Sequence, residues 1–492
     1  MSTRRALVFS FLDRYSSLTL SILSSMVIAR LLTPAEIGVF SVTMVMIMFI
    51  SALRDLGAGQ YLVQVQELTP ARVRATWTVL LGTGCFMALI VLAGAWPASR
   101  FYHEPRMFEI MLVIAANFAI NPFGSMTYAW LMRQMKFDSL AIMRAGSSLA
   151  GSVTSVYLAW RGHGPISLAF GSLAATLTNG LISLRYRPGH FAWWPGLKGV
   201  REVVGFGSKI SAGSLIFNIA NGAPELLLGK LQGLAAAGFY SRSNGLALMF
   251  QRLLLDATQS VAMPLFATAQ RKEGSLNEPF LRSISYVTAL GWSFFIGLAL
   301  LAHPLTRLLY GDQWGASIPV TRLLALGMVI NLPCAMCPQA LMASGRPGQM
   351  LRGIIAVVSV QVLSVAIGAT QGLEGAAIGF VLAQLAIVSI WLLISHRHLG
   401  FDWAALRHVL RQSATLAGAA SLAPLAVVLL LGQAPPERVL PLVLSLIGGL
   451  TLFVLSARWL RHPIHEELVR AANHFAPSLW ARAKPPGRPE CK

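Results

Sequence analysis

Long apolar segments constrain this chain more than any other feature of its sequence. About fourteen runs of mostly apolar residues follow one another, each near the roughly 20 residues that a helix needs to cross the hydrocarbon core of a bilayer. Their approximate extents are 8–31, 36–56, 76–97, 107–131, 139–160, 162–184, 205–229, 235–257, 282–309, 317–343, 350–371, 373–395, 412–432 and 438–459. The sequence therefore predicts an all-α polytopic membrane protein with about 14 transmembrane helices.

The composition agrees with a chain that lies in lipid. Only 12% of the 492 residues are charged, whereas soluble domains contain about a quarter. The formal net charge of +20 would suggest a nucleic-acid partner in a soluble protein. Here the basic residues stand between the apolar runs, so we interpret them as topology signals and predict no nucleic-acid partner.

The distribution of Lys and Arg predicts the orientation of the chain in the membrane. With a cytoplasmic N-terminus, most basic residues fall on the cytoplasmic side, as the positive-inside rule requires. The connection that holds Arg185, Arg187, Lys198 and Arg201 is the clearest case. Both termini are therefore expected in the cytoplasm. The pair Trp193–Trp194 in the same connection is typical of an interfacial anchor.

Two internal echoes indicate a repeat. Residues 29–41 are echoed at 229–241, with a basic residue, Leu, Ala, Gly, an aromatic residue and Ser in the same order. A second echo pairs Ile120-Asn121 with Ile330-Asn331. In both cases a helix matches the helix six spans further along the chain, which has the same orientation in the membrane. This predicts a parallel repeat about an axis along the membrane normal. The expected parts are an N-lobe with its linker at 1–200, a C-lobe at 201–398, two added helices at 399–460 and a basic cytoplasmic tail at 461–492.

Polar residues inside the predicted spans are the candidate site. The first and seventh spans each carry a polar stripe at helical spacing, in which Arg14 matches position 214 and Glu225 matches Ser25. Charges within the hydrocarbon are costly and usually face a cavity or a partner, so the stripes suggest a wet cavity between two halves. Interhelical hydrogen bonds and snorkelling to the headgroups are the competing interpretations.

The candidate residues fall into two groups. Those expected to bind an anionic substrate are Arg14, Arg54, Lys209, Arg252, Asn218 and Asn221. Those expected to balance these charges, or to carry a coupling ion, are Asp13, Asp55, Glu225 and Asp256. Guanidinium groups suit phosphate because they donate bidentate hydrogen bonds.

Motifs for other chemistry are absent from the sequence. No segment matches the phosphate-binding pattern GxxxxGK[ST]. The CxxC of Cys334 and Cys337 lies within a predicted span and lacks a second ligand pair. We therefore predict no catalytic residues, no metal, no cofactor and no enzymatic activity.

Five segments of the chain form a recognisable series by their order and spacing: Ile28–Gly38, Leu131–Phe137, Leu231–Arg242, Tyr310–Trp314 and Ala343–Arg346. This series resembles Wzx-type polysaccharide flippases, the lipopolysaccharide and exopolysaccharide exporters of the MOP superfamily. The resemblance implies a flippase that moves undecaprenyl-diphosphate-linked oligosaccharide from the cytoplasmic to the periplasmic leaflet of the bacterial inner membrane. It also implies alternating access between two six-helix lobes, coupling to a proton or sodium ion, and contact with membrane lipids and other polysaccharide-assembly proteins.

The same resemblance bears on two of the candidate cations. Arg54-Asp55-Leu56-Gly57 resembles a segment of the lipid II branch in which the arginine is thought to meet pyrophosphate. The helix 1 arginine of that branch has no clean match, because Arg14 is displaced by about a turn or more.

Two other functions remain as alternatives at this point. A multidrug or small-solute cation antiporter belongs to the same superfamily, but that branch usually has twelve spans, and this chain has two more. A membrane glycan polymerase or ligase belongs to a different class. The lack of a large loop that could hold its active site argues against it.

Overall fold

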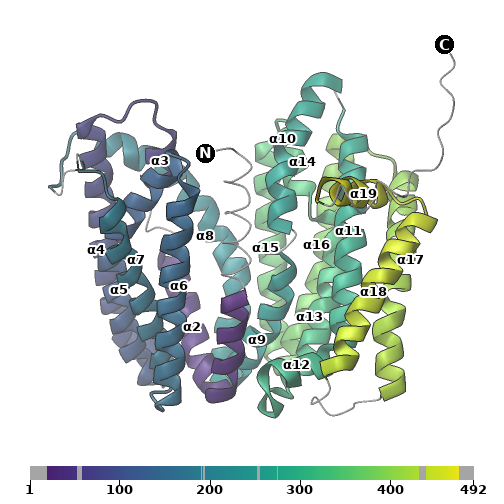
Figure 1. Cartoon of the computed structure of the whole chain (residues 1–492), viewed down its shortest axis with the longest axis horizontal. Helices are drawn as coiled ribbons and strands as arrows, with labels where there is room; N and C mark the ends of the chain where they lie inside the picture. Colours follow the sequence, from purple (N-terminus) through teal and green to yellow (C-terminus); the bar gives the residue numbers. More distant parts are fainter. Residues whose placement is uncertain are drawn as a thin grey trace. The chain divides into compact units, whose positions relative to one another are not determined.

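The computed structural model is helical throughout the part of the chain that it describes (Figure 1). It describes residues 19–475 apart from 52–57, 190, 192–193, 252–254, 274 and 432–438. Ten helices in this part are long and apolar enough to cross a membrane, and Thr19–Leu31 is a shorter apolar helix. The predicted all-α polytopic class is confirmed, whereas the count of fourteen spans is not.

The helices follow one another with short connections. In chain order after Thr19–Leu31 they are α2 (Pro34–Ser51), α3 (Ala58–Gln64), α4 (Pro70–Tyr102), α5 (Arg106–Arg133), α6 (Phe137–Trp160), α7 (Ile166–Tyr186), α8 (Val200–Leu231), α9 (Leu234–Phe250), α10 (Asp256–Glu273), α11 (Asn277–Leu300), α12 (Ala302–Tyr310), the 3-10 turn η2 (Asp312–Trp314), α13 (Ser317–Asn331), the 3-10 turn η3 (Leu332–Cys334), α14 (Cys337–Ala343), α15 (Pro347–Ala369), α16 (Leu373–Leu399), α17 (Trp403–Leu431), α18 (Val439–Trp459) and α19 (Pro463–Phe475).

Each of the fourteen predicted extents overlaps a described helix, but several boundaries differ. The expected span 317–343 is broken at η3, because Pro333 and Pro338 lack the backbone N–H that continues an α-helix. The expected span 282–309 is divided between α11 and α12. The polar helix α10, which ends in Arg271 and Lys272, was not predicted because it lacks a sustained apolar run.

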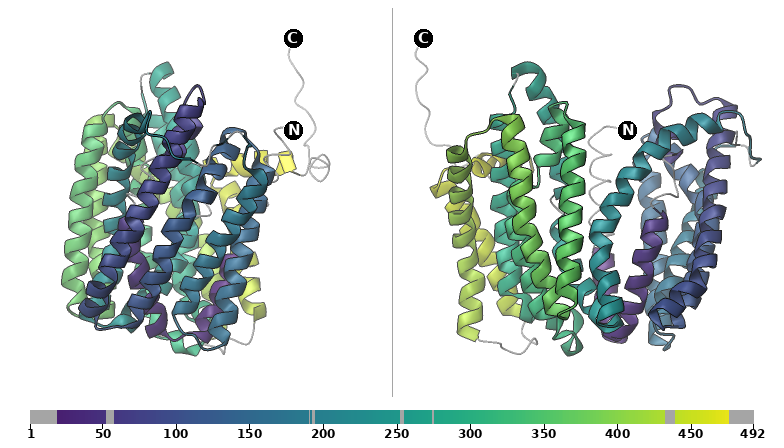
Figure 2. Two further views of the ribbon diagram at one scale, coloured as in Figure 1. Left: turned by 90° about the vertical axis from the view of Figure 1, so that its left-hand side faces the viewer. Right: turned by 180° about the vertical axis from the view of Figure 1, so that it is seen from behind.

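The chain forms two compact units. The first contains residues 1–242 with 309–317 and 362–379, and the second contains 243–308, 318–361 and 380–492. Within the first unit α5 packs on α4 and on α7, and α6 packs on α7; these four helices run side by side in the turned views (Figure 2). The expected boundaries at 200, 398 and 460 stay a prediction.

Local signals in the sequence explain how the helices begin. The Thr33 amide donates to Glu36 Oε2 at 2.8 Å, and the Glu36 amide donates to Thr33 Oγ1 at 3.3 Å. This is the reciprocal capping box that Thr33-Pro34-Ala35-Glu36 predicts. It fixes the first turn of α2, which is the turn that meets Gly238 of α9.

The second unit ends in an amphipathic helix. α19 lies across the ends of α11, α17 and α18 instead of parallel to them (Figure 1), with Ile464 buried in a core that includes Leu416 and Phe453. A polar-apolar helix that follows the last span is typical of an interfacial segment. The start of the tail expected at 461–492 is thus an amphipathic helix.

Candidate functional site

Half of the ten predicted site residues lie outside the described residues. This is true of Arg14, Arg54, Arg252, Asp13 and Asp55. Lys209 in α8 and Asp256 in α10 belong to described helices, but the placement of their side chains is not described. The geometry of the site therefore has to be built from the remaining residues of α8 and from what packs against them.

The described polar residues of α8 have three different environments. Asn218 Nδ2 donates to the Met48 carbonyl of α2 at 3.1 Å, which is an interhelical hydrogen bond of the kind that polar residues make in membranes. Asn221 is exposed. Glu225 is buried, with 8% of its surface exposed. The expected single polar stripe is therefore divided, and its buried end is the charged residue.

Two glycines 200 residues apart bring α2 and α9 into backbone contact. A Cβ atom added to Gly38 would lie 1.7 Å from the Leu234 carbonyl oxygen, and one added to Gly238 would lie 2.0 Å from the Pro34 oxygen. No side chain fits at such distances, so only glycine permits this crossing. The two contacts mirror each other, since each glycine faces the first turn of the other helix.

Two serines continue the same relation one turn further along. Ser41 Oγ donates to Ser241 Oγ at 2.7 Å across the two helices. Equivalent residues of two repeats meet each other only near the two-fold axis that relates the repeats. We call the contact of Gly38, Ser41, Gly238 and Ser241 the axial junction.

A second pair of mirrored contacts surrounds the axial junction. The end of α4 packs on α8, where Tyr102 Oη donates to the Leu226 carbonyl at 3.2 Å. The turn η2 packs on the helix Thr19–Leu31, where Trp314 Nε1 donates to the Ala29 carbonyl at 2.8 Å. Each repeat thus sends the end of one of its later helices onto the first helix of the other repeat.

Arg242 and Glu225 place two charged groups beside the axial junction. Arg242 Nη1 donates to Ser25 Oγ at 2.6 Å, and the Arg242 guanidinium carbon lies 5.6 Å from the centroid of the Tyr310 ring and 5.8 Å from that of Trp314. Glu225 contacts the Ser241 hydroxyl and interacts electrostatically with Arg242. Arg242 is thus a cation that lies over two aromatic rings and near a buried carboxylate.

Arg242 is absent from the site residues predicted from the sequence. It closes the segment Leu231–Arg242 that carries part of the family resemblance, but it lies outside the polar stripes of the first and seventh spans. The repeat itself contained the signal. In the register that pairs Ser41 with Ser241, position 42 is Val and position 25 is Ser, where positions 242 and 225 are Arg and Glu.

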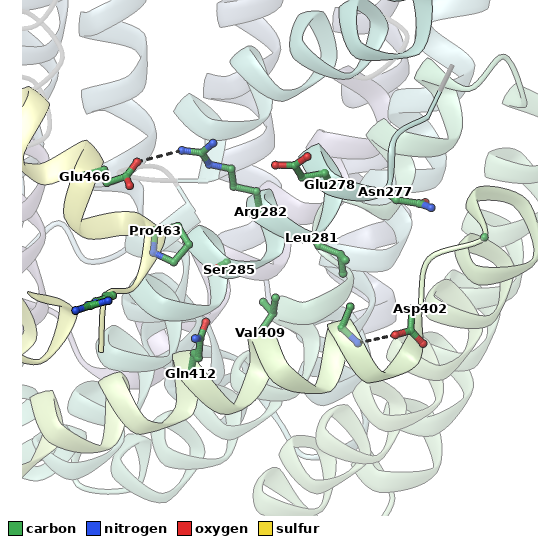
Figure 3. Close-up of a pocket in the computed structure, with 13 residues that line it drawn as sticks. Asn277, Glu278, Leu281, Arg282, Ser285, Asp402, Val409, Gln412, Pro463 and Glu466 are labelled. Carbon is green, nitrogen blue, oxygen red and sulfur yellow. Dashed lines mark hydrogen bonds and ion pairs between the residues drawn. The ribbon is translucent and has the colours of Figure 1, made fainter. Parts of the chain in front are cut away.

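A separate cavity of about 660 Å³ lies in the second unit between α11, α17 and α19 (Figure 3). Arg282 borders it and pairs with Glu466 of α19 at 3.9 Å and Glu467 at 3.6 Å. Asp402 is occupied as the cap of α17, since it accepts from the amides of Ala404 and Ala405 at 3.1 Å. Arg282 and Asp402 are thus both paired with groups of the protein at this cavity.

His462 fixes the start of α19 beside the same cavity. It is 1% exposed, its Nε2 lies 3.0 Å from Ser285 Oγ, and its Nδ1 accepts from the Ile464 amide at 3.2 Å. Burial lowers the pKa of His462 to about 4, because desolvation disfavours the imidazolium. A neutral imidazole is also required by the geometry, since a protonated Nδ1 could not accept the Ile464 bond.

Comparison with known proteins agrees with this architecture. The chain is 26% identical over 408 residues to the succinoglycan biosynthesis transport protein ExoT of Rhizobium meliloti, which covers 81% of this chain and 79% of that protein. It is 23% identical over 388 residues to the lipopolysaccharide biosynthesis protein WzxC of Escherichia coli, covering 76% of this chain and 77% of that protein.

Solved structures show the same fold. The lipid II flippase MurJ in an inward closed conformation matches 94% of this chain and 100% of its own length, with a TM-score of 0.74 and 12% identity. An inward-facing multidrug MATE transporter of the MOP superfamily matches 81% of this chain and 99% of its own, with a TM-score of 0.63 and 15% identity. A family model described as polysaccharide biosynthesis protein matches residues 27–319. The chain is therefore a multi-span membrane protein that belongs to the polysaccharide biosynthesis protein family.

Proposed function

We propose that the protein is a flippase that moves undecaprenyl-diphosphate-linked oligosaccharide from the cytoplasmic to the periplasmic leaflet for O-antigen or exopolysaccharide biosynthesis. The observation that supports this most is the axial junction, with its buried charges, in a chain of the polysaccharide biosynthesis protein family. Two repeats that meet on an axis within the membrane are the framework on which many transporters alternate access. The relatives named above are a transport protein and a lipopolysaccharide biosynthesis protein.

The substrate would be recognised by its two chemical parts. The diphosphate would be attracted by Arg14, Arg54, Lys209 and Arg252, since arginine and lysine are the usual partners of phosphate in proteins. Amide side chains such as Asn221 can donate to and accept from sugar hydroxyls. The polyprenyl chain would stay in lipid while the glycan crosses in water.

Glu225 is the candidate for ion coupling whose surroundings are described. It is buried, and it is in contact with Ser241 and near Arg242, so that adding a proton or a sodium ion would change the charge balance of the axial junction. Asp13, Asp55 and Asp256 are the other carboxylates proposed for this role. A protein that works in this way needs no nucleotide and performs no covalent chemistry, so it is not an enzyme.

The proposal places the protein in the bacterial inner membrane with both termini in the cytoplasm. Its partners there are membrane lipids, the lipid-linked oligosaccharide and the other proteins of polysaccharide assembly. Fusion of a reporter that is active only in the periplasm to either terminus should give no signal, and an active fusion would contradict this orientation.

A transport assay with purified protein tests the function. Liposomes are loaded in one leaflet with an undecaprenyl-diphosphate oligosaccharide from the organism's own pathway, and exposure of the glycan to an added glycan-modifying enzyme is followed over time, with and without a proton or sodium gradient. We expect protein-dependent exposure of a glycan of unchanged length. No exposure under any gradient would contradict the flippase, and a change in glycan length would indicate a polymerase or ligase.

A further inference from the structure

Arg242 connects two segments that belong to different repeats. It lies on α9, and its Nη1 donates to Ser25 Oγ at 2.6 Å on the helix Thr19–Leu31. The hydrogen bond has no counterpart in the other repeat, because position 42 is Val42, which is fully buried. Position 42 therefore supplies packing alone, where position 242 supplies a charged hydrogen bond.

The surroundings of Arg242 are suited to a cation that remains in place. A guanidinium keeps its charge at any physiological pH, and removing it from water is costly unless it is paired. Arg242 donates to Ser25, lies over the rings of Tyr310 and Trp314, and interacts electrostatically with Glu225, so four segments of the chain surround it. Separation of the helix Thr19–Leu31 from α9 would remove several of these contacts at once.

We propose that Arg242 is a positioning residue that holds the axial junction closed and so sets the conformation in which the protein rests. This role rests on the proposed function, because a resting conformation exists only if the junction opens during a transport cycle. A role in folding alone does not require an arginine here, because the backbone crossing of Gly38 and Gly238 is already symmetric and the equivalent site is filled by Val42.

Thiol accessibility of the junction tests the proposal without any lipid substrate. Ser41→Cys is introduced into a variant that lacks the four native cysteines, and its reaction rate with a water-soluble maleimide is measured on protein purified in detergent. We expect Arg242→Val to raise this rate about tenfold, the effect of losing one hydrogen bond to a charged group. Arg133→Val is the matched control, since Arg133 is a cation of the same unit that lies at the other end of α5 from Arg106 and donates to the Leu62 carbonyl at 2.9 Å.

Because the two repeats are pseudo-symmetric, the charges can be moved to the equivalent positions of the other repeat. This should restore the closed junction, which would not be expected if Arg242 served only to fill space. The fourfold variant S25E, V42R, E225S and R242V moves both charges to the equivalent positions of the first repeat. We expect it to return the maleimide rate close to that of the unaltered junction. An unchanged rate in R242V would overturn the proposal, as would a folded fourfold variant that reacts as fast as R242V.

A variant that retains the charge covers the case in which R242V does not fold. Arg242→Lys keeps the cation but loses the planar guanidinium that stacks on Tyr310 and Trp314, so we expect a rate between those of the wild type and R242V. A rate equal to that of the wild type would show that stacking and the Ser25 bond do not hold the junction.

Failure of this proposal can be distinguished from failure of the proposed function. If the thiol rates change as expected but the wild type exposes no glycan in liposomes, the flippase function is wrong and the role of Arg242 in closing the junction stands. If the wild type flips and R242V leaves the thiol rate unchanged, the flippase stands and the role of Arg242 is wrong.

Discussion

The sites around Val42 and Arg242 occupy equivalent positions of the two repeats but differ in chemistry. Val42 is buried against α8, where a Cβ added to Gly229 would meet it at 2.7 Å and would lie 3.4 Å from Tyr102. Arg242 meets the ring of Tyr310 and the hydroxyl of Ser25. Both sites use a tyrosine from the end of a later helix, so the two sites share a scaffold and differ in charge.

This difference separates what builds the junction from what controls it. Glycine and serine occur on both sides of the axis and bring the helices together. Arg242 and Glu225 occur on one side only. Substitutions of the shared glycines should therefore have equal effects in the two repeats, whereas substitutions of Arg242, of Glu225 or of the residues that contact them should not.

The largest effect is expected from the glycines of the axial junction. Gly38→Ala and Gly238→Ala each place a methyl group within about 2 Å of a carbonyl oxygen, so each should lower the free energy of unfolding by more than about 3 kcal/mol. Denaturation by SDS in mixed micelles measures this. Gly82→Ala, which has nothing within 4 Å of the added carbon, is the control. Clearly unequal effects of the two junction variants would contradict the symmetry.

Removal of the buried carboxylate should have the next largest effect. Glu225→Ala removes the carboxylate that contacts Ser241 and interacts electrostatically with Arg242, which should cost about 2 to 3 kcal/mol, the upper range for a hydrogen bond to a charged group. Ser25→Ala, at the equivalent position, removes one hydrogen bond to a charged group and should cost about 1.5 kcal/mol. The same SDS assay compares them, and equal losses would show that Glu225 carries no special charge role.

Acid sensitivity should come from the second unit and not from the junction. Because the pKa of His462 is lowered to about 4, the unfolded chain binds a proton below its ordinary pKa of about 6.5 before the folded chain does. Stability is therefore fully present above pH 6.5 and is lost as the pH falls toward 4, by about 2 kcal/mol at pH 5. His462→Asn should flatten this dependence between pH 7 and pH 5. A slope that persists in the variant would assign it to another group.

The smallest effect is expected from the paired serines. Ser41→Ala removes one hydroxyl contact and should cost about 0.5 to 1 kcal/mol, whereas Ser241→Ala should cost about 1 to 1.5 kcal/mol because Ser241 also contacts Glu225. In the background of Glu225→Gln this difference should shrink. If the two variants differ as much there as in the wild type, Glu225 is not the cause of the asymmetry.

The fold was largely predictable because its main signals are local. Apolar runs of membrane length, the capping box at Thr33 and Glu36, and the echo of 29–41 at 229–241 all appear in short windows of sequence. The break at η3 could have been predicted from Pro333 and Pro338. The helix α10 could not have been predicted from apolar periodicity, because its composition is too polar.

The site was predictable only in part because it depends on how the repeats meet. Glu225 was predicted as a site residue because it is a charge within a span. Such charges are costly in the hydrocarbon and usually face a partner or a cavity, and Glu225 is indeed buried against Ser241. Arg242 required knowledge that α2 and α9 cross at Gly38 and Gly238. Asn218, by contrast, makes an interhelical hydrogen bond, which was the competing interpretation of the polar stripe.

The central claim is that the axial junction opens during transport of a lipid-linked oligosaccharide. Cysteines at Ser41 and Ser241, whose hydroxyl oxygens are 2.7 Å apart, should form a disulfide on oxidation in a variant without native cysteines. In the liposome assay we expect this double variant to expose glycan when reduced, to stop when oxidised, and to resume when reduced again. Continued exposure by fully oxidised protein would show that the junction does not open and would contradict the account.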